Sequence, residues 1–290
     1  MSILITGSSG FIGKNYFDHS ENKSKSVSVS LQKKAIGQID FSQTKTIVHL
    51  AGIAHRMNEP SGKIYYDVNT DLTFALAKHA KSKGVSQFIF VSTIKVFGEK
   101  KGFDITFNAQ SPCEPHDDYG KSKYKAEQAL AELQDKNFKI AIIRPSLVYG
   151  KGVKGNLEKL MGLITKGYKL PFGDIDNKRS MIYVGNLIAM IDTIIDQQAH
   201  GIFIGTDQRP MSTSQLIQNI QTNLGQQNKL FSLPKSFRIL IKLLKPELYK
   251  RLFCSLVVEN TKAYDNLNFI PPYSTSEGIE DMVNHYKENN

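Results

Sequence analysis

The sequence contains little of what cross-links a secreted fold or spans a membrane. Only two of its 290 residues are cysteines, Cys113 and Cys254, too few for a disulfide framework and in keeping with a reducing compartment. Asp192, Asp196 and Lys242 interrupt the best apolar runs, so none reaches the roughly 20 residues of a membrane-spanning helix. No basic leader precedes the first apolar strand. We therefore expect a cytoplasmic protein in which both cysteines are inert packing residues.

Apolar residues and positive charge are plentiful. Hydrophobic residues make up 40% of the chain and charged residues 22%, which excludes wholesale disorder. Lys and Arg number 37 against 27 Asp and Glu, a net charge of +10. Such an excess suits an anionic partner: a phosphorylated ligand, an acidic membrane surface or nucleic acid. We do not expect nucleic acid, because no recognised binding module or aromatic-interleaved basic patch accompanies the charge.

Short apolar strands alternate with helices along the first half of the chain. Strands are predicted at 2–6, 26–31, 46–50, 87–92 and 139–144, and helices at 12–20, 60–83 and 119–135. This alternation predicts an α/β fold with a doubly wound, parallel Rossmann sheet whose strands are covered on both faces. Two later strands, at 180–184 and 202–205, are expected to extend the same sheet.

The chain is expected to divide into two domains. Residues 1–150 would form a dinucleotide-binding domain, with 179–206 rejoining its sheet. Residues 151–178 and 207–290 would form a smaller, mainly helical substrate lobe at the C-terminal end. A ligand is expected between the two, at the carboxyl ends of the strands.

A glycine-rich turn follows the first strand. Gly7, Gly10 and Gly13 are spaced three residues apart, just before a predicted helix. Gly7 would allow the tight turn, Gly10 the approach of a pyrophosphate, and Gly13 the close packing of helix on strand. The helix N-terminus offers amides and a positive dipole to the phosphates. The turn therefore predicts dinucleotide binding; the alternative is a plain strand–turn–helix connection.

The second strand ends without the acidic residue that would bind the ribose 2′-hydroxyl of NAD. Gln32, Lys33 and Lys34 follow it instead, and a 2′-phosphate would suit either lysine. We therefore expect NADP or NAD as cofactor, with NADPH slightly favoured. The alternative for the lysines is a solvated basic loop.

Tyr119 and Lys123 are four residues apart in a predicted helix and so share one face. A free tyrosine, with a pKa of about 10, is a poor acid–base at neutral pH. A neighbouring ammonium and the positive nicotinamide ring of a bound cofactor would both favour the phenolate and lower that pKa. Thr93 ends the fourth strand, at the edge where doubly wound sheets bind ligands. A Tyr-x-x-x-Lys pair alone usually decorates a surface, but together with Thr93 and the glycine turn it predicts proton transfer at a substrate oxygen.

Five motifs occur in the order found in the extended short-chain dehydrogenase/reductases. They are Thr-Gly-x-x-Gly-x-x-Gly at 6–13, His-Leu-Ala-Gly at 49–52, Val-Ser-Thr at 91–93, Tyr-Gly-Lys-Ser-Lys at 119–123 and Arg-Pro-Ser-Leu-Val-Tyr-Gly at 144–150. The sequence thus resembles the NAD-dependent epimerase/dehydratase family of that group. The resemblance implies that Thr93, Tyr119 and Lys123 are catalytic. It also implies that Lys123 hydrogen-bonds the nicotinamide ribose.

The resemblance also implies binding residues. Those for the cofactor are Gly7, Ser9, Gly10, Phe11, Ile12, Lys33, Asp40, Phe41, Leu50, Ala51, Gly52, Asn69, Tyr119, Lys123 and Pro145. Those for the substrate are Thr93, Ile94, Lys95, Asn156, Leu157 and Arg179. The guanidinium of Arg179 would clamp a diphosphate; the alternative is an ordinary surface arginine before a strand. No metal site is expected.

The motifs narrow the expected reaction. Dehydratases of the family carry Asp-Glu after the threonine, where this sequence has Ile94-Lys95, so dehydration is disfavoured. Segments 92–99, 147–154 and 179–187 look like bacterial enzymes of surface-polysaccharide assembly. Those enzymes use a nicotinamide cofactor to reduce the C4 ketone of UDP-4-keto-6-deoxy-N-acetylhexosamines, which is our first expectation. Gly185-Asn186 replaces an acidic pair found in many epimerases and also favours the reductase.

Two alternatives to the reductase remain. One is a UDP-N-acetylhexosamine 4-epimerase, which would use Thr93, Tyr119 and Lys123 in the same way and keep NAD tightly bound. The other is a catalytically inactive dinucleotide sensor that binds a protein partner. Sensors of this fold usually lack the tyrosine or the lysine, and both are present here. The resemblance also implies a homodimer formed through paired helices.

A basic amphipathic segment lies at 228–251, with seven Lys or Arg against one acid, Glu247. Phe237, Leu240, Ile241 and Leu244 fall on one helical face. We expect that face to pack on its own domain and leave the lysines in solvent. The alternative is weak contact with an anionic membrane surface.

Overall fold

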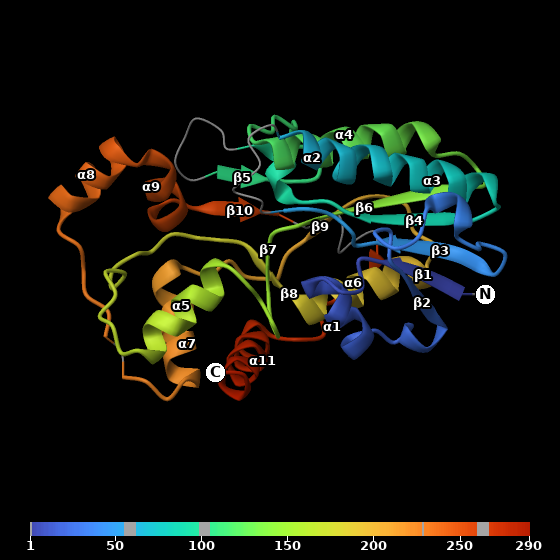
Figure 1. Ribbon diagram of the computed structural model, residues 1–290. Helices are drawn as coiled ribbons and strands as arrows, with labels where there is room; N and C mark the ends of the chain where they lie inside the picture. The colour runs from blue at the N-terminus through green and yellow to red at the C-terminus, as the bar shows by residue number, and fades with distance from the viewer. Residues whose placement is uncertain (1, 55–61, 99–104, 228, 260–266) are drawn as a thin grey trace.

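The computed structural model describes residues 2–54, 62–98, 105–227, 229–259 and 267–290. Six parallel strands form the central sheet, in the order β2-β1-β3-β4-β6-β9 (Figure 1). They are β1 (Ser2–Thr6), β2 (Ser26–Val29), β3 (Thr44–His49), β4 (Gln87–Val91), β6 (Lys139–Pro145) and β9 (Gly201–Gly205). The direction of winding reverses between β1 and β3, which confirms the predicted doubly wound Rossmann sheet.

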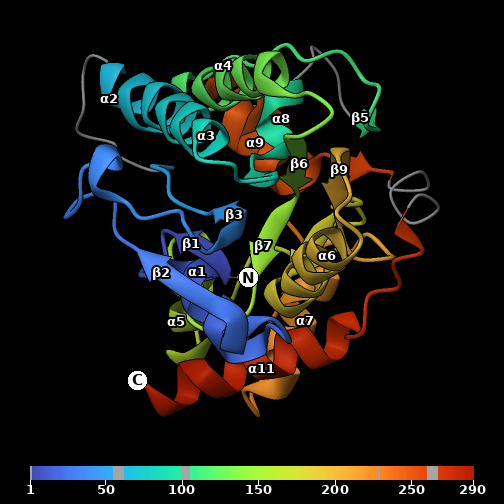
Figure 2. The same ribbon diagram turned by 90° about the vertical axis from the view of Figure 1, so that its right-hand side faces the viewer.

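Helices cover both faces of this sheet (Figures 1 and 2). One face carries α2 (Lys63–Tyr66), α3 (Leu72–Ser82) and α4 (Asp118–Leu133), and the other α1 (Phe11–His19) and α6 (Val184–Asp196). A π-helical turn over Asp67–Asp71 joins α2 to α3, and 3₁₀ turns occur at Lys23–Lys25, Ile36–Gln38 and Ile94–Phe97. Because side chains alternate along a strand, Phe88 and Phe90 pack with α3 and α4, whereas Ile89 and Val91 pack with α1 and α6.

Two expectations about individual strands are wrong. β2 is not covered on both faces, because it is the edge strand, and Val27 is 56% exposed. The strand near 180–184, β8 (Met181–Tyr183), does not join the central sheet but pairs in parallel with β7 (Leu147–Tyr149). β9 occupies the place beside β6, so β8 pairs with the segment that continues β6.

The C-terminal part of the chain adds helices at one end of the sheet. α5 (Asn156–Thr165), α7 (Thr213–Asn223) and α11 (Thr275–Glu288) gather together, and their apolar side chains share one core with the sheet (Figure 1). β5 (Ile105–Phe107) pairs with β10 (Leu256–Val258), and α8 (Lys235–Leu244) and α9 (Pro246–Phe253) form a hairpin at the edge of the molecule. The division into two domains stays a prediction. Across the described ranges, no helix is long and apolar enough to cross a membrane.

Candidate active site

The glycine turn after β1 is built on close contacts that exclude side chains. Gly7 has a φ of +76°, and a Cβ added there would lie 2.5 Å from the backbone nitrogen of Ala51 on the neighbouring strand end. A Cβ at Gly13 would lie 2.2 Å from the carbonyl oxygen of Gly7. Only glycine fits either position. The turn thus brings the start of α1 against the ends of β1 and β3.

The first turn of α1 fits the pyrophosphate of a dinucleotide. Gly10 is its N-cap and makes no side-chain capping hydrogen bond, and the first turn carries no acidic residue. Ser9 and Gly10 are exposed, and Phe11 and Ile12 are partly exposed. The backbone amides and the positive dipole end therefore face a position where an anion is favoured.

The residues expected at the adenosine end of the cofactor include exposed charged side chains and one buried aromatic ring. Lys33 and Lys34 are exposed in the loop after β2. Hydrogen bonds from Ser42 and the nearby charge of Lys34 lower the pKa of Asp40, so Lys34 lies close to that carboxylate. The side chain of Phe41 is buried in the core below α3, which leaves its backbone as the part able to contact a cofactor.

The loop after β3 is tied to α4 through Asn69. The Asn69 side chain accepts from the Ile53 amide at 2.9 Å and donates to the Ile53 carbonyl at 3.0 Å and to the Ser122 hydroxyl at 3.1 Å. A Cβ at Gly52 would lie 3.0 Å from Asn69 Oδ1 and 3.1 Å from Lys123 Nζ. Gly52 therefore leaves room for two polar groups expected near the cofactor. Leu50 and Ala51 are half-buried beside it, and Pro145 is buried at the end of β6.

Thr93 and Tyr119 come together at the carboxyl end of β4. The Thr93 hydroxyl is close enough to the Tyr119 phenol to affect its pKa, and Thr93 Oγ1 accepts from the Lys95 amide at 3.2 Å. Asp117 caps α4 by accepting from the Gly120 amide at 2.6 Å, which fixes the start of the helix beside Tyr119. Burial raises the pKa of Tyr119 to about 12, although the Thr93 hydroxyl opposes the rise.

Lys123 lies one helical turn beyond Tyr119 and is buried. Its Nζ donates to the Val91 carbonyl at 2.9 Å and lies 4.5 Å from the centroid of the Phe90 ring. Burial lowers the pKa of Lys123 to about 8, partly opposed by Glu127. The predicted lowering of the Tyr119 pKa by Lys123 is wrong for this arrangement. Burial dominates at the phenol, and the ammonium is held by a backbone carbonyl.

Lys95 forms an ion pair with Asp117, and its Nζ lies 5.7 Å from the centroid of the Tyr119 ring. The residue that replaces a dehydratase acid thus sits beside the candidate catalytic tyrosine. Ile94 is partly buried against an apolar cluster that includes Val96. The site has a basic group where dehydration would need carboxylates.

A buried network behind Lys123 was missed by sequence reasoning. Arg144 Nη2 lies 2.6 Å from Glu127 Oε2, and Ser92 donates to Glu127 Oε1. Both charged side chains are 4% exposed. Glu127 follows Lys123 by four residues, as Lys123 follows Tyr119. The repeated interval places all three on one face of α4 and could have indicated that Glu127 belongs to the site. The network joins α4 to β4 and β6 and so positions Tyr119 and Lys123.

His49, from the His-Leu-Ala-Gly motif, is a second buried positioning residue. Its two ring nitrogens lie 2.7 Å from the Thr6 hydroxyl and 2.9 Å from the Thr73 hydroxyl. Burial, with a smaller effect of Lys123, lowers the pKa of His49 to about 3. The neutral ring therefore links β1, β3 and α3 under the cofactor turn.

The predicted substrate residues of the C-terminal half occupy separate elements. Arg179 Nη1 donates to the Cys254 carbonyl at 3.1 Å, and its backbone pairs with Met211. Asn156 is exposed at the start of α5, whereas the Leu157 side chain is buried in the core. Leu157 could therefore contact a ligand only through its backbone.

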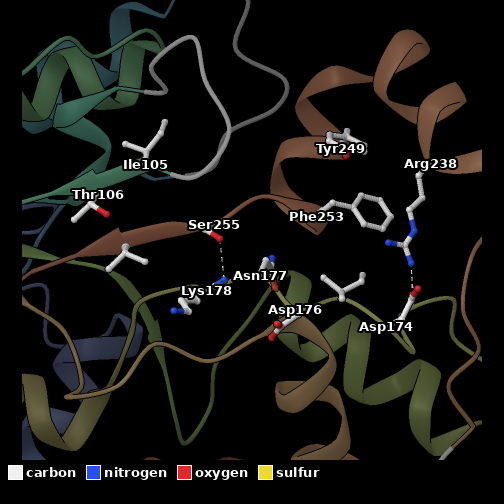
Figure 3. Close-up of a pocket in the computed structure, with 12 residues that line it drawn as sticks. Ile105, Thr106, Asp174, Asp176, Asn177, Lys178, Arg238, Tyr249, Phe253 and Ser255 are labelled. Atoms are coloured by element: carbon white, nitrogen blue, oxygen red, sulfur yellow. Dashed lines mark hydrogen bonds and ion pairs between the residues drawn. The ribbon is translucent and has the colours of Figure 1, made fainter. Parts of the chain in front are cut away.

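A cavity of about 520 Å³ lies between the β5–β10 pair, segment 174–178 and the α8–α9 hairpin (Figure 3). Segment 174–178 directly precedes Arg179 in the sequence. Its polar lining includes Asp174, Asp176, Lys178 and Arg238. None of Thr93, Tyr119 and Lys123 lines it. The cavity is thus distinct from the site at the end of β4.

Comparison with known proteins agrees with this geometry. The model of the NAD dependent epimerase/dehydratase family matches residues 3–204. The chain belongs to this family. It is thus an enzyme of the extended short-chain dehydrogenase/reductase type that uses a nicotinamide dinucleotide, which confirms the resemblance seen in the five motifs.

Two relatives match along nearly the whole chain. A UDP-glucose 4-epimerase of Vibrio cholerae is 34% identical over 316 residues, covering 100% of this chain and 96% of the relative. An N-acetyl-α-D-glucosaminyl-diphospho-ditrans,octacis-undecaprenol 4-epimerase of Escherichia coli O157:H7 is 26% identical, covering 96% and 93%. The crystal structure of UDP-N-acetylglucosamine 4-epimerase from Bacillus cereus superimposes with a TM-score of 0.79 over 99% of both chains, at 17% identity, and so shares the fold.

Proposed function

We propose that this enzyme is a nucleotide-sugar 4-epimerase, which oxidises C4 of a diphosphate-linked sugar and reduces it again from the other face. The observation that carries the proposal is the adjacent pair of buried Thr93 and partly buried Tyr119, with Lys123 one turn away and the glycine turn at the same sheet edge. Both relatives described above have 4-epimerase in their names, which supports C4 as the reacting carbon.

The residues present fit a nicotinamide dinucleotide. The turn from Gly7 to Ile12 would hold its pyrophosphate, and Lys123, beside Gly52 and Asn69, would hold the nicotinamide ribose. When bound, the cofactor supplies the hydride acceptor and donor and a positive ring. A preference for NADP over NAD, which would rest on Lys33 and the missing acid after β2, would suit the second candidate described below rather than an epimerase with resident NAD.

Tyr119 acts on the oxygen at C4. With its pKa near 12 it keeps its proton at neutral pH, so in this arrangement it is set to donate to a C4 ketone. Removing a proton from a C4 hydroxyl requires positive charge nearby, from Lys123 and from the bound cofactor. The Thr93 hydroxyl lies beside Tyr119 and would orient the same substrate oxygen.

The sugar carrier is proposed to be UDP. The relative named for UDP-glucose shares 34% identity with this chain, against 26% for the relative named for a diphospho-undecaprenol sugar. Both names contain a diphosphate-linked sugar, which suits the clamp proposed for Arg179, with Asn156 and the Leu157 backbone as further contacts. A place in surface-polysaccharide precursor synthesis belongs to the same proposal.

Reduction of a UDP-4-keto-6-deoxy-N-acetylhexosamine is the second candidate. It is favoured by the loop after β2, where Lys33 is exposed and no acid follows the strand, because a consumed NADPH would suit this loop. Gly185-Asn186 no longer favours it. Asn186 is buried and donates to Asp207 and the Tyr273 carbonyl at 2.8 and 2.9 Å, so it has a structural task.

The two candidates separate in one experiment. Purified enzyme is incubated with UDP-glucose or UDP-N-acetylglucosamine without added cofactor, and the configuration at C4 is followed by NMR. A 4-epimerase gives the C4 epimer using resident NAD, and the Tyr119→Phe variant does not. No epimer, together with NADPH-dependent reduction of the 4-keto-6-deoxy sugar, would establish the reductase instead. Activity on neither substrate class would overturn both candidates.

A further inference from the structure

Two basic side chains of α8 contact neighbouring parts of the protein. Arg238 of α8 forms an ion pair with Asp174, and its guanidinium carbon lies 5.4 Å from the centroid of the Phe253 ring (Figure 3). Lys242, one turn on, lies 5.8 Å from the ring centroid of Tyr249. Arg238 thus faces the cavity, and Lys242 lies beside α9 while remaining exposed.

The apolar stripe of α8 faces solvent as a result. No residue of α8 or α9 is buried. Leu243 is 74% exposed, Leu244 71%, and Phe237, Ile239 and Leu240 are also exposed. The expectation that this face packs on its own domain is therefore wrong, because the side of α8 that faces the cavity carries Arg238 instead.

We propose that the exposed face of the α8–α9 hairpin docks on an anionic lipid bilayer surface. A contiguous set of large apolar side chains on a helix lying at the protein edge can enter the boundary between headgroups and acyl chains. Residues 235–253 carry six Lys or Arg and one acid, Glu247. Of these, Arg238 pairs with Asp174 and Lys250 with Glu247, whereas Lys235, Lys242, Lys245 and Arg251 are exposed and complement anionic headgroups.

A second copy of the chain fits this face less well. A two-fold contact would place the same patch against itself. It would bring two hairpins together, each with five more basic than acidic residues between 235 and 253, and like charges at such close range repel. A bilayer offers both an apolar layer and the opposite charge.

The hairpin also lies near the catalytic helix. Arg251 of α9 helps to lower the pKa of Asp117, the N-cap of α4, so its charge is close to that carboxylate. Asp117 in turn pairs with Lys95 beside Tyr119. Docking through the hairpin would therefore hold the candidate active site close to the lipid surface.

The test is vesicle flotation of the full chain, without substrate or added cofactor. Vesicles contain either phosphatidylcholine alone or phosphatidylcholine with about a third phosphatidylglycerol. The wild type is expected to float with the anionic vesicles and to dissociate as salt screens the charge. Leu243→Asp should weaken binding at least about tenfold, and Lys245→Gln about fivefold.

Ile270→Asp is the matched control, because Ile270 is 77% exposed outside the hairpin, and it should bind as the wild type does. Neither Leu243 nor Ile270 is buried, so both variants are expected to fold, which circular dichroism checks. Equal binding by the Leu243→Asp variant, or no binding of wild type to anionic vesicles, would overturn the proposal. Concentration-dependent dimers that Leu243→Asp abolishes, without vesicle binding, would identify a second copy as the occupant. The outcome does not depend on which reaction the enzyme catalyses.

Discussion

The Thr93 hydroxyl at the end of β4 lies beside the Tyr119 phenol in the first turn of α4 and opposes the rise of the Tyr119 pKa. Two residues 26 positions apart in sequence therefore place their hydroxyl groups side by side, as the proposed contact of both with one substrate oxygen requires. The capping carboxylate of Asp117 and the buried Glu127–Arg144 pair hold α4 in the position that this contact requires.

Removing the Tyr119 hydroxyl should abolish proton transfer while leaving the fold intact. Tyr119→Phe is expected to lower kcat by about 10²–10⁴, the usual contribution of a positioned acid–base group. Cofactor affinity and melting temperature should change little. Steady-state kinetics and cofactor titration measure these effects, and a kcat within tenfold of wild type would refute the role of Tyr119.

Arg179 is expected to act through substrate binding. Arg179→Ala should mainly raise KM for the UDP-sugar, because a bidentate contact with a diphosphate is lost in ground state and transition state alike. Such a contact contributes about 1.5–3 kcal/mol, or about 10- to 150-fold in KM. An unchanged KM would mean that Arg179 has a structural role, which includes its contact with the Cys254 carbonyl.

The loop after β2 tests cofactor preference. The double variant Lys33→Ala/Lys34→Ala should weaken NADPH binding by roughly 5- to 30-fold and NADH binding less. Lys34 is close to Asp40, so most of the effect should come from Lys33, which single variants would show. The difference should shrink with salt. Equal loss of both cofactors in fluorescence titrations would identify a solvated loop.

The buried, neutral His49 should make the free energy of unfolding decrease in weak acid. Its pKa is about 3 in the folded protein against an ordinary 6.5, so the unfolded chain binds a proton that the folded chain excludes. Its contribution to the free energy of unfolding is fully present above pH 6.5 and is lost as the pH falls towards 3. By pH 5 the loss is about 2 kcal/mol. Urea denaturation at pH 7 and pH 5 measures it. A His49→Gln variant should start less stable but lose less on acidification; equal losses would contradict the assignment.

Features that depend on short sequence intervals could be predicted, whereas features that depend on contacts between distant residues could not. The alternation of strands and helices, the spacing of Gly7, Gly10 and Gly13, and the Tyr119–Lys123 interval each follow from local geometry. The orientation of α8 does not, because its apolar stripe predicts burial unless the contact between Arg238 and Asp174 is known. The high pKa of Tyr119 likewise comes from burial by residues distant in sequence.

The most direct test of the proposed reaction follows the hydrogen at C4 of the sugar. The enzyme is given an equimolar mixture of UDP-glucose and UDP-N-acetylglucosamine, each deuterated at C4, and the products are examined by NMR. Removal and return of a hydride predicts a product inverted at C4 that keeps its deuterium there. A C4 configuration that stays unchanged, or an inverted product in which solvent hydrogen has replaced the deuterium, would contradict it.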